Sequence, residues 1–290
     1  MDLVTVQFEY NNSNYFKRLL DVFIQSCIDV LGSEPIVYKI PCPLNGMARP
    51  GAWRHNNTDK LEVWNDHIQN ATQDTVLIDC DMLIMQDFSE VWQHDFDVAI
   101  TKRSEKKSKL RQFPNGIPYN GGVVFVRNTD SAKRFIQAWT DCNRYLFENT
   151  RAHSGYLKKY AGMNQAALGY LLEARNGYDI CKVIDVPCAK YNACAPDFWE
   201  NGNAKIVHIK GDLRKEVFSR QPKKDAPTYK YVSIWKDIEQ RVNPGIHEAE
   251  LPEANINEKE SVRIQSKKAR KRKSLILERR GTRNAQHKSA

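Results

Sequence analysis

The chain has 290 residues, of which 41% are hydrophobic, so it is long enough for one large domain or two small ones. No apolar run approaches the length of a membrane span, so we expect no membrane-spanning helix. The net charge is +9, but residues 255–290 hold 12 Lys/Arg and 3 Asp/Glu, so the tail carries all of the excess charge.

The predicted elements of the first half alternate between strands and helices. Apolar residues at a period near 3.6 indicate amphipathic helices, and short apolar runs between turn residues indicate buried strands. In chain order we expect a strand over 3–10, a helix over 14–32, a strand over 35–40, a Pro/Gly/Arg-rich loop over 41–57, a helix that Thr58 caps, and a strand over 75–79.

The second half mixes the two types of element. We expect strands over 95–100, 121–127, 180–187 and 204–209, and helices over 129–148 and 161–174. This order predicts an α/β fold with a mainly parallel central sheet flanked by helices. We expect one folded domain over 1–242, followed over 243–290 by a linker and a basic, disordered tail.

Two aspartates interrupt an apolar stretch in "TVLIDCDMLIM". Asp79 and Asp81 follow the expected third strand, beyond the carboxyl end of which parallel α/β sheets bind ligands. Residues i and i+2 of an extended segment project to the same side, so the two carboxylates converge while Cys80 points into the body. A divalent cation would relieve their repulsion and desolvation. The alternative is an acidic pair in a solvated loop.

A phosphatase or phosphotransferase of the haloacid dehalogenase type also has Asp-x-Asp after a strand. Its pair follows the first strand of the domain and has Thr or Val two residues further on. Here the pair follows the third expected strand, and Leu83 stands at that position. This family is therefore the less favoured alternative.

The seven cysteines are scattered, without a Cys-x-x-Cys pair. This pattern favours a reducing compartment, and a disulfide between Cys188 and Cys194 is the alternative. The amino terminus "MDLVTVQFEY" lacks the basic and apolar segments of a signal peptide. We therefore expect a cytoplasmic protein.

Five segments in a fixed order resemble a known family. They are "TDKLEVWNDH", "VLIDCDMLIMQDFSEVW", "YNGGVVFVRN", "MNQAAL" and "VHIKGDLRK". Their succession, over about residues 3–215, is similar to the GT-A glycosyltransferases of family 8, the group of glycogenin and the lipopolysaccharide hexosyltransferases. The resemblance implies a Rossmann-like GT-A fold and transfer of a hexose from a nucleotide sugar, usually a UDP-hexose, with retention of anomeric configuration. It also implies Mn²⁺ or Mg²⁺ as a Lewis acid at the diphosphate.

The resemblance also implies roles for individual residues. The matched metal ligands are Asp79, Asp81 and His208, and the imidazole favours Mn²⁺. The matched donor residues are Tyr15 at the nucleobase, Asn120 and Gly121 at the sugar, and Lys60, Gly211, Arg214 and Lys215 at the diphosphate. Arg214, which we also expect to act in catalysis, stands where the family usually has Lys.

Four of these residues keep an alternative interpretation. Tyr15 also fits a core tyrosine, Lys60 an ordinary surface lysine, and His208 a structural histidine. Asn120 with its following glycine also fits a hairpin turn.

One position departs from the family pattern. Asn164 stands where the family commonly has Asp, directly before Gln165. An amide holds sugar hydroxyls but cannot form a covalent glycosyl intermediate. We therefore expect both residues to serve catalysis by orienting the donor, with same-face attack by the acceptor. The alternatives are a changed donor, or a weak or inactive relative that binds a nucleotide sugar or nucleic acid.

The basic tail predicts an anionic partner. An acidic membrane surface, met peripherally at the inner leaflet, is favoured over nucleic acid because the tail has no aromatic residues for stacking on bases. A solubilising disordered tail is the third interpretation. A glycan, a lipid-linked glycan, a protein and a modified nucleic acid all remain open as the acceptor.

Overall fold

The structure, a computed structural model, describes residues 1–9, 14–41, 52–103, 118–160, 162–195, 198 and 202–245. A central sheet has the strand order β2-β1-β3-β6-β5-β7. The strand β6 runs antiparallel to both neighbours, and the other pairs are parallel. The expected α/β fold with a mainly parallel sheet is confirmed. The six strands are β1 (Asp2–Glu9), β2 (Ile36–Pro41), β3 (Thr75–Ile78), β5 (Val98–Lys102), β6 (Tyr119–Val126) and β7 (Val183–Pro187).

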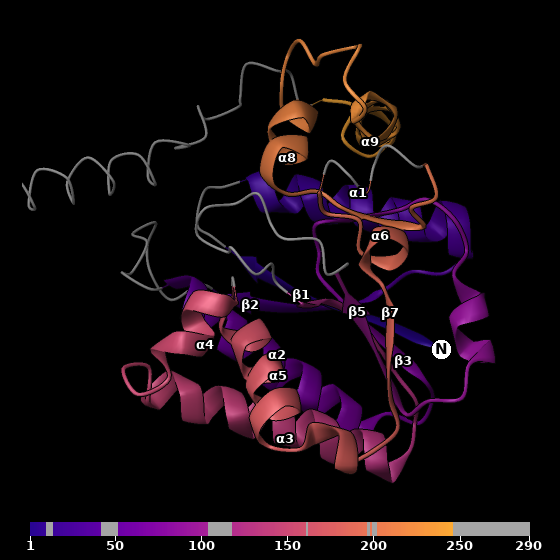
Figure 1. The fold of residues 1–290 in the computed structure, drawn as a ribbon. Coiled ribbons are helices and arrows are strands. Elements are labelled where there is room, and N and C mark those ends of the chain that lie inside the picture. Colours follow the sequence, from indigo (N-terminus) through magenta and orange to yellow (C-terminus); the bar gives the residue numbers. More distant parts are fainter. Residues whose placement is uncertain are drawn as a thin grey trace, which may run out of the picture. The chain divides into compact units, whose positions relative to one another are not determined.

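Helices cover both faces of this sheet (Figure 1). One face carries α2 (Ala52–Asn70), α3 (Asp130–Glu148), α4 (Ser154–Lys159) and α5 (Met163–Ala174). The other face carries α1 (Asn14–Leu31), α6 (Cys188–Tyr191), α8 (Gly211–Val217) and α9 (Tyr229–Val242). Two 3-10 helices, η1 (Ser89–Gln93) and η2 (Gly177–Asp179), lie in the connections. Large apolar side chains such as Phe135 and Trp139 of α3 are fully buried against the sheet, as their helical spacing requires.

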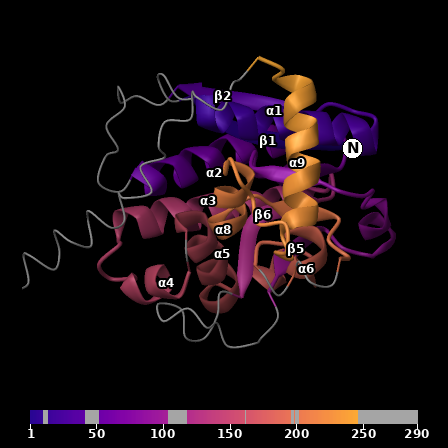
Figure 2. The same ribbon diagram turned by 90° about the horizontal axis from the view of Figure 1, so that it is seen from above.

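The helix α9 packs across α1 (Figure 2). Trp235 of α9 is fully buried in the core beneath it. Arg18 of α1 donates to Glu239 of α9 at 2.5 Å, and its guanidinium lies 5.9 Å from the Trp235 ring centroid. This contact links α1 to α9.

A second, two-stranded sheet joins β4 (Met82–Ile84) and β8 (Ile206–His208) in antiparallel register. Met82 pairs with His208, and the amide of Ile209 donates to the carbonyl of Asp81 at 2.8 Å. All three residues of β4 are buried. The apolar sequence after the acidic pair therefore forms a strand of its own.

One sequence-based expectation and two alternatives that the sequence left open are wrong. The helix α2 begins at Ala52, so Thr58 does not cap it; its hydroxyl donates to the carbonyl of Arg54 at 2.9 Å inside the helix. The Asn120–Gly121 pair lies within β6, so it is not a hairpin turn. Cys188 and Cys194 are free thiols, so they form no disulfide.

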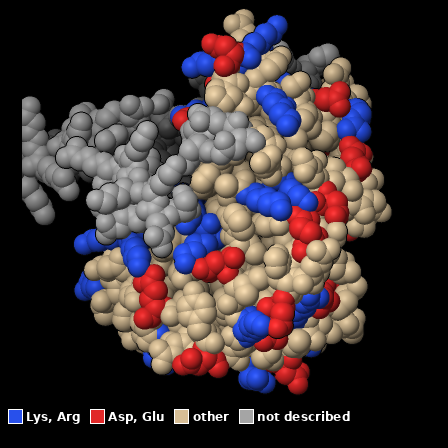
Figure 3. All heavy atoms as spheres, turned by 45° about the vertical axis from the view of Figure 1, so that its right-hand side comes forward, with Lys and Arg blue, Asp and Glu red and all other residues tan. Residues whose placement is uncertain are grey.

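Met1–Pro244 form one compact unit. Among the described residues, no helix is long and apolar enough to cross a membrane. Lys and Arg alternate with Asp and Glu over the face shown in Figure 3, as expected where the excess charge is confined to residues 255–290. The expected basic tail lies outside the described residues, and the domain boundary at residue 242 stays a prediction.

Candidate functional site

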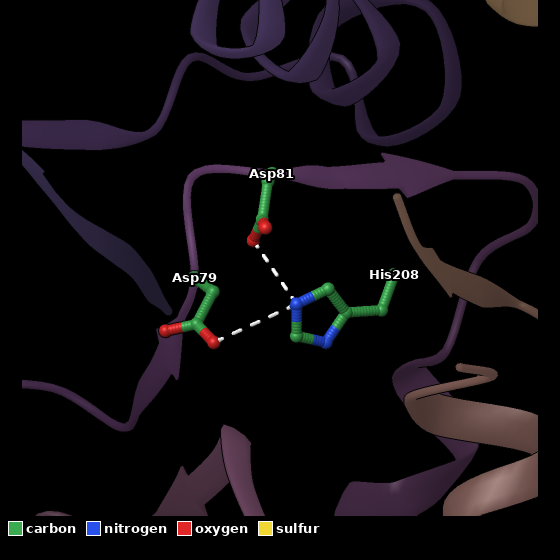
Figure 4. Close-up of side chains that lie close together, drawn as sticks. All are labelled: Asp79, Asp81 and His208. Carbon is green, nitrogen blue, oxygen red and sulfur yellow. Dashed lines mark ion pairs between the residues drawn. The ribbon is translucent and has the colours of Figure 1, made fainter. Parts of the chain in front are cut away.

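The acidic pair and the late histidine meet where β3 ends and the small sheet begins (Figure 4). Asp79 follows the last residue of β3, Asp81 directly precedes β4, and His208 ends β8. Nε2 of His208 lies 3.2 Å from Oδ1 of Asp81 and 3.9 Å from Oδ2 of Asp79. One ligand atom from each residue lies within 4.8 Å of the others. The pairing of β4 with β8 holds these groups together through the backbone.

Two side-chain cations neutralise the acidic pair. Nζ of Lys60 lies 2.5 Å from Oδ1 of Asp79, and the guanidinium of Arg214 pairs with Oδ2 of Asp81. Burial disfavours the charged form of Asp81, but the His208 ring, when it is protonated, and the Arg214 guanidinium outweigh burial and hold the pKa of this carboxyl well below its usual range. Asp81 is therefore ionised at neutral pH, as metal ligation requires.

Lys60 reaches the site from α2 along the ring of Trp64. Its Nζ lies 4.4 Å from the ring centroid, and Trp64 is fully buried. Lys60 itself is only 8% exposed, so it is not an ordinary surface lysine. Its contact with a diphosphate stays a prediction.

The helix α8 begins beside the acidic pair. Gly211 has a φ of +59°, in the left-handed region that favours glycine. One turn later, Nε of Arg214 donates to the carbonyl of Ile209 at 2.7 Å, which directs its guanidinium toward the acidic pair. Lys215 instead pairs with Asp212 at 2.9 Å, and its side chain is 57% exposed. Of the two neighbouring cations, Arg214 belongs to the site.

Tyr15 lies beside Arg214, at the start of α1. Its ring stacks on Phe218 with a centroid distance of 4.5 Å, and its hydroxyl oxygen accepts a hydrogen bond from the Arg214 guanidinium. Burial raises the pKa of this phenol, and Arg214 opposes the rise. Tyr15 is half-buried, with its ring against Phe218, so the nucleobase contact stays a prediction.

Asn164 and Gln165 lie in the first turn of α5. Asn164 is 3% exposed, and its carbonyl accepts from Nε1 of Trp139 at 2.8 Å. A Cβ on Gly121 would lie 3.4 Å from Nδ2 of Asn164, so this side chain lies against β6. The structure thus brings Gly121 and Asn164 together.

Asn120 is 2% exposed and its amide is engaged by protein groups. Nδ2 lies 3.5 Å from Sγ of Cys194 and 3.9 Å from Sγ of Cys188, and Oδ1 accepts from the amide of Gly122 at 3.2 Å. A contact with a donor sugar would require this amide to exchange a partner. That role stays a prediction.

Two residues beside the ligands carry roles that the sequence did not reveal. A Cβ on Gly122 would lie 2.8 Å from Oδ2 of Asp79, closer than real contacts allow. Oδ1 of Asn192 lies 3.0 Å from Nδ1 of His208. The Gly-Gly pair in a strand pattern was a usable signal of close approach. Asn192 lies in no motif, so nothing in the sequence marks it.

Comparison with known families agrees with this arrangement. Residues 65–213, which contain Asp79, Asp81 and His208, match the family described as nucleotide-diphospho-sugar transferase. This chain belongs to that family. A search of curated protein sequences found no match. The matched range ends before Arg214 and begins after Lys60.

Several solved structures are similar to this chain at low sequence identity. The transferase is similar to a glycosyltransferase involved in glycosylation of the major capsid of PBCV-1, with a TM-score of 0.51 and 13% identity over 81% of this chain and 100% of that one. The galactosyltransferase LgtC, solved with donor and acceptor sugar analogues, gives a TM-score of 0.47 and 11% identity over 84% and 96% of the two chains. Mouse xyloside xylosyltransferase 1 gives a TM-score of 0.41 and 9% identity over 73% of this chain and 98% of that one. At these identities the likeness concerns the fold alone, and the expected GT-A fold is confirmed.

The acidic pair and His208 fit a divalent cation. Carboxylate oxygens suit hard ions such as Mg²⁺ and Mn²⁺, and an imidazole extends the set toward Mn²⁺. The three ligand atoms converge from two strand ends, and Asp81 is already charged. These residues form a possible metal group of the kind typical of GT-A enzymes, and the choice of ion stays a prediction.

Proposed function

We propose that this transferase moves a hexose from a nucleotide-sugar donor, with UDP as the leaving diphosphate, to a glycan, lipid-linked glycan or protein acceptor, with retention of configuration. The observation that supports this proposal is the convergence of Asp79, Asp81 and His208 with two cations at the end of β3. Six described cysteines are free thiols, which supports a cytoplasmic location.

Asp79, Asp81 and His208 would hold Mn²⁺ or Mg²⁺. When bound, such an ion stabilises the negative charge that builds on the departing diphosphate. Arg214 and Lys60 add positive charge at the same edge, and the Arg214 guanidinium can bind two phosphate oxygens at once. The glycine at position 211 has no neighbour within 4 Å of a Cβ, which leaves room for a phosphate close to the backbone.

On the sugar side, we propose that Asn164 and Gln165 orient the donor. Both side chains are amides, which donate and accept hydrogen bonds but do not act as nucleophiles. Gln165 is more exposed than Asn164 and so is the better placed of the two for direct contact. The acceptor hydroxyl would then attack on the face from which the diphosphate leaves, without a covalent intermediate at Asn164.

A panel of nucleotide sugars tests the proposal. The full-length protein is incubated with each donor and Mn²⁺ or Mg²⁺, and the released nucleoside diphosphate is measured, because such transferases slowly pass the sugar to water. We expect release from a UDP-hexose, and its loss with EDTA and in Asp81→Asn. If no donor is hydrolysed although UDP with Mn²⁺ raises the melting temperature, the protein is a binding relative without turnover. If EDTA leaves release unchanged, the metal assignment is wrong.

A further inference from the structure

A row of buried polar groups runs from β6 to His208. Thr101 and Asn192 are fully buried, and His208 is 5% exposed. Oγ1 of Thr101 lies 2.6 Å from the carbonyl oxygen of Asn120, and Nδ2 of Asn192 lies 3.2 Å from Oγ1 of Thr101. Oδ1 of Asn192 lies 3.0 Å from Nδ1 of His208. Because these groups are shielded from water, each must find its hydrogen-bond partner within the row.

The direction of these hydrogen bonds follows from the first group. The Thr101 hydroxyl has one proton, and both carbonyls near it, those of Asn120 at 2.6 Å and Val123 at 3.3 Å, can only accept. The hydroxyl therefore donates to the backbone and offers a lone pair to Asn192. Only the NH₂ end of the Asn192 amide can donate to that lone pair. The carbonyl end must then face His208.

This orientation decides which ring nitrogen of His208 carries the proton. Oδ1 of Asn192 can only accept, so Nδ1 of His208 must be N–H. Nδ1 keeps this proton in either charge state of the ring, so Nε2 is the nitrogen that offers a lone pair whenever the ring is neutral. Nε2 is the nitrogen that faces Asp81 and Asp79, at 3.2 Å and 3.9 Å. Three electron-pair donors thus converge on one point.

We propose that Asn192 and Thr101 are positioning residues that fix the tautomer of His208, so that Nε2 is always presented to a divalent cation between the two carboxylates. This inference rests on the proposed metal site and assigns two of its supporting residues. Hydrogen bonds of this kind to a ligating histidine orient the ring and raise its basicity.

The backbone fixes both positioning residues. The pairing of β5 with β6 changes register between Ile100 and Thr101, which brings Thr101 opposite Asn120. The amide of Asn192 donates to the carbonyl of Cys188 at 2.9 Å. The next residue, Ala193, bridges to β8 and accepts from the amide of His208 at 2.9 Å. The backbone contacts of Asn192 and Ala193 with α6 and β8 therefore hold the Asn192 side chain against His208.

The first test measures binding of Mn²⁺ alone to the full-length protein, by electron paramagnetic resonance of the free ion. We expect Asn192→Ala to weaken binding about 10- to 100-fold, the range found when such partners are removed. Asn192→Asp keeps an acceptor oxygen in place and should restore binding to within a few-fold. Thr101→Val keeps the shape without the hydroxyl and should also weaken binding, whereas Thr101→Ser should not.

The second test reads the tautomer directly. Long-range ¹H–¹⁵N spectra of protein labelled at histidine distinguish N–H at Nδ1 from N–H at Nε2, and a His208→Asn spectrum assigns the signal. We expect Nδ1–H in the wild type and a shift toward Nε2–H in Asn192→Ala. A wild-type ring protonated at Nε2 but not at Nδ1, or an Asn192→Ala protein unchanged in both tautomer and Mn²⁺ binding, would overturn the proposal.

Two controls keep these tests decisive. If Asn192→Ala does not fold, as judged by thermal unfolding, the Val and Ser variants of Thr101 carry the test alone. If the wild type binds no Mn²⁺, the proposed function fails, but the tautomer spectra still report separately on the row from Thr101 to His208.

Discussion

Each carboxylate of the acidic pair contacts one side-chain cation and also faces the proposed metal position. Asp79 meets Lys60 and Asp81 meets Arg214, while both also face the point at which a divalent ion would be held. Burial lowers the pKa of Arg214, but Asp81 outweighs it and raises that pKa, so this guanidinium stays charged. The side-chain cations therefore compensate the charge of the acids and also compete with a metal for their oxygens. A diphosphate would relieve that competition by offering Arg214 and Lys60 other oxygens.

Position 122 must be glycine because Asp79 and Asn192 lie too close to it to leave room for a side chain. In Gly122→Ala the new Cβ would lie 2.8 Å from Oδ2 of Asp79 and 3.1 Å from Nδ2 of Asn192. Both neighbours are held by hydrogen bonds, so we expect a loss of about 1–3 kcal/mol in the free energy of unfolding. Mn²⁺ binding should weaken as well, because Asp79 must move. Urea unfolding and Mn²⁺ titration measure the two effects.

Gly155→Ala is the matched control for Gly122. It lies in α4, and nothing approaches within 4 Å of its Cβ position. We expect its stability to be unchanged or slightly raised, since alanine favours helix. Equal behaviour of the two variants would contradict the steric argument.

Replacing Asn164 or Gln165 of α5 by Ala should have different effects on turnover and on stability. Gln165→Ala should lower turnover with little change in stability, because Gln165 is half-exposed at the proposed sugar contact. Asn164→Ala removes a buried side chain that lies against Gly121, so we expect a smaller loss of turnover and a loss of stability of about 1–2 kcal/mol. Steady-state release of nucleoside diphosphate and urea unfolding separate the two outcomes.

A covalent adduct would change this assignment. If Asn164→Asp gains a mass shift equal to one hexose after incubation with the donor, a nucleophile can act at this position. The native mechanism would then have to be reconsidered.

At the scale of elements, the sequence located most strands and helices because their apolar patterns are local. It missed the start of α2, since residues 52–57 ("AWRHNN") have no apolar stripe. It also missed the pairing of Met82 with His208, which joins segments far apart in the chain. Asp79, Asp81 and His208 were found through their motif, whereas Asn192 acts only through three-dimensional proximity. The sequence therefore predicted the metal-ligand residues, which lie in local motifs, but not the residues that contact them only in the folded structure.

The 3-10 helix η1 is tied to the strand that carries His208 by Glu90. Its Oε1 lies 2.6 Å from Nζ of Lys205, just before β8, and 3.1 Å from Nζ of Lys190 in α6, and it accepts from the Tyr191 hydroxyl at 2.9 Å. Burial opposes ionisation of Glu90, but these hydrogen bonds outweigh it and lower its pKa to about 2. One carboxylate thus connects three elements.

Replacing this carboxylate should have an effect that depends on pH. The folded pKa lies below the ordinary value of 4.5, so the stabilisation is complete above about pH 4.5 and is lost as the pH falls toward 2. We expect Glu90→Gln to cost on the order of 1 kcal/mol at pH 7, after allowance for partial exposure. The gap to the wild type should shrink between pH 4.5 and pH 3 in urea unfolding. Glu148→Gln, at an exposed site on α3, serves as the control, and a gap that is constant with pH would contradict the assignment.

At the scale of the whole molecule, charge is divided between two parts of the chain. Residues 1–254 hold 44 − 12 = 32 basic and 35 − 3 = 32 acidic residues, and residues 255–290 hold the remaining excess of nine positive charges. Every residue proposed to bind the metal or the donor lies before residue 216. The tail can therefore affect where the transferase works without affecting how it works.

We predict that the tail attaches the protein to anionic membranes. Each basic residue near an acidic lipid surface contributes about 1 kcal/mol, and the tail offers 12 of them with only 3 acids. It contains no Trp, Phe or Tyr to insert, so attachment should weaken steeply as salt rises. Full-length protein and a form ending at residue 245 are compared on vesicles with and without phosphatidylserine, and on duplex DNA, at two salt concentrations. We expect only the full-length protein to bind the anionic vesicles at low salt, while both forms hydrolyse the donor equally. Equal vesicle binding by the truncated form, or tighter binding of the full-length form to DNA than to vesicles, would show that the tail has another partner.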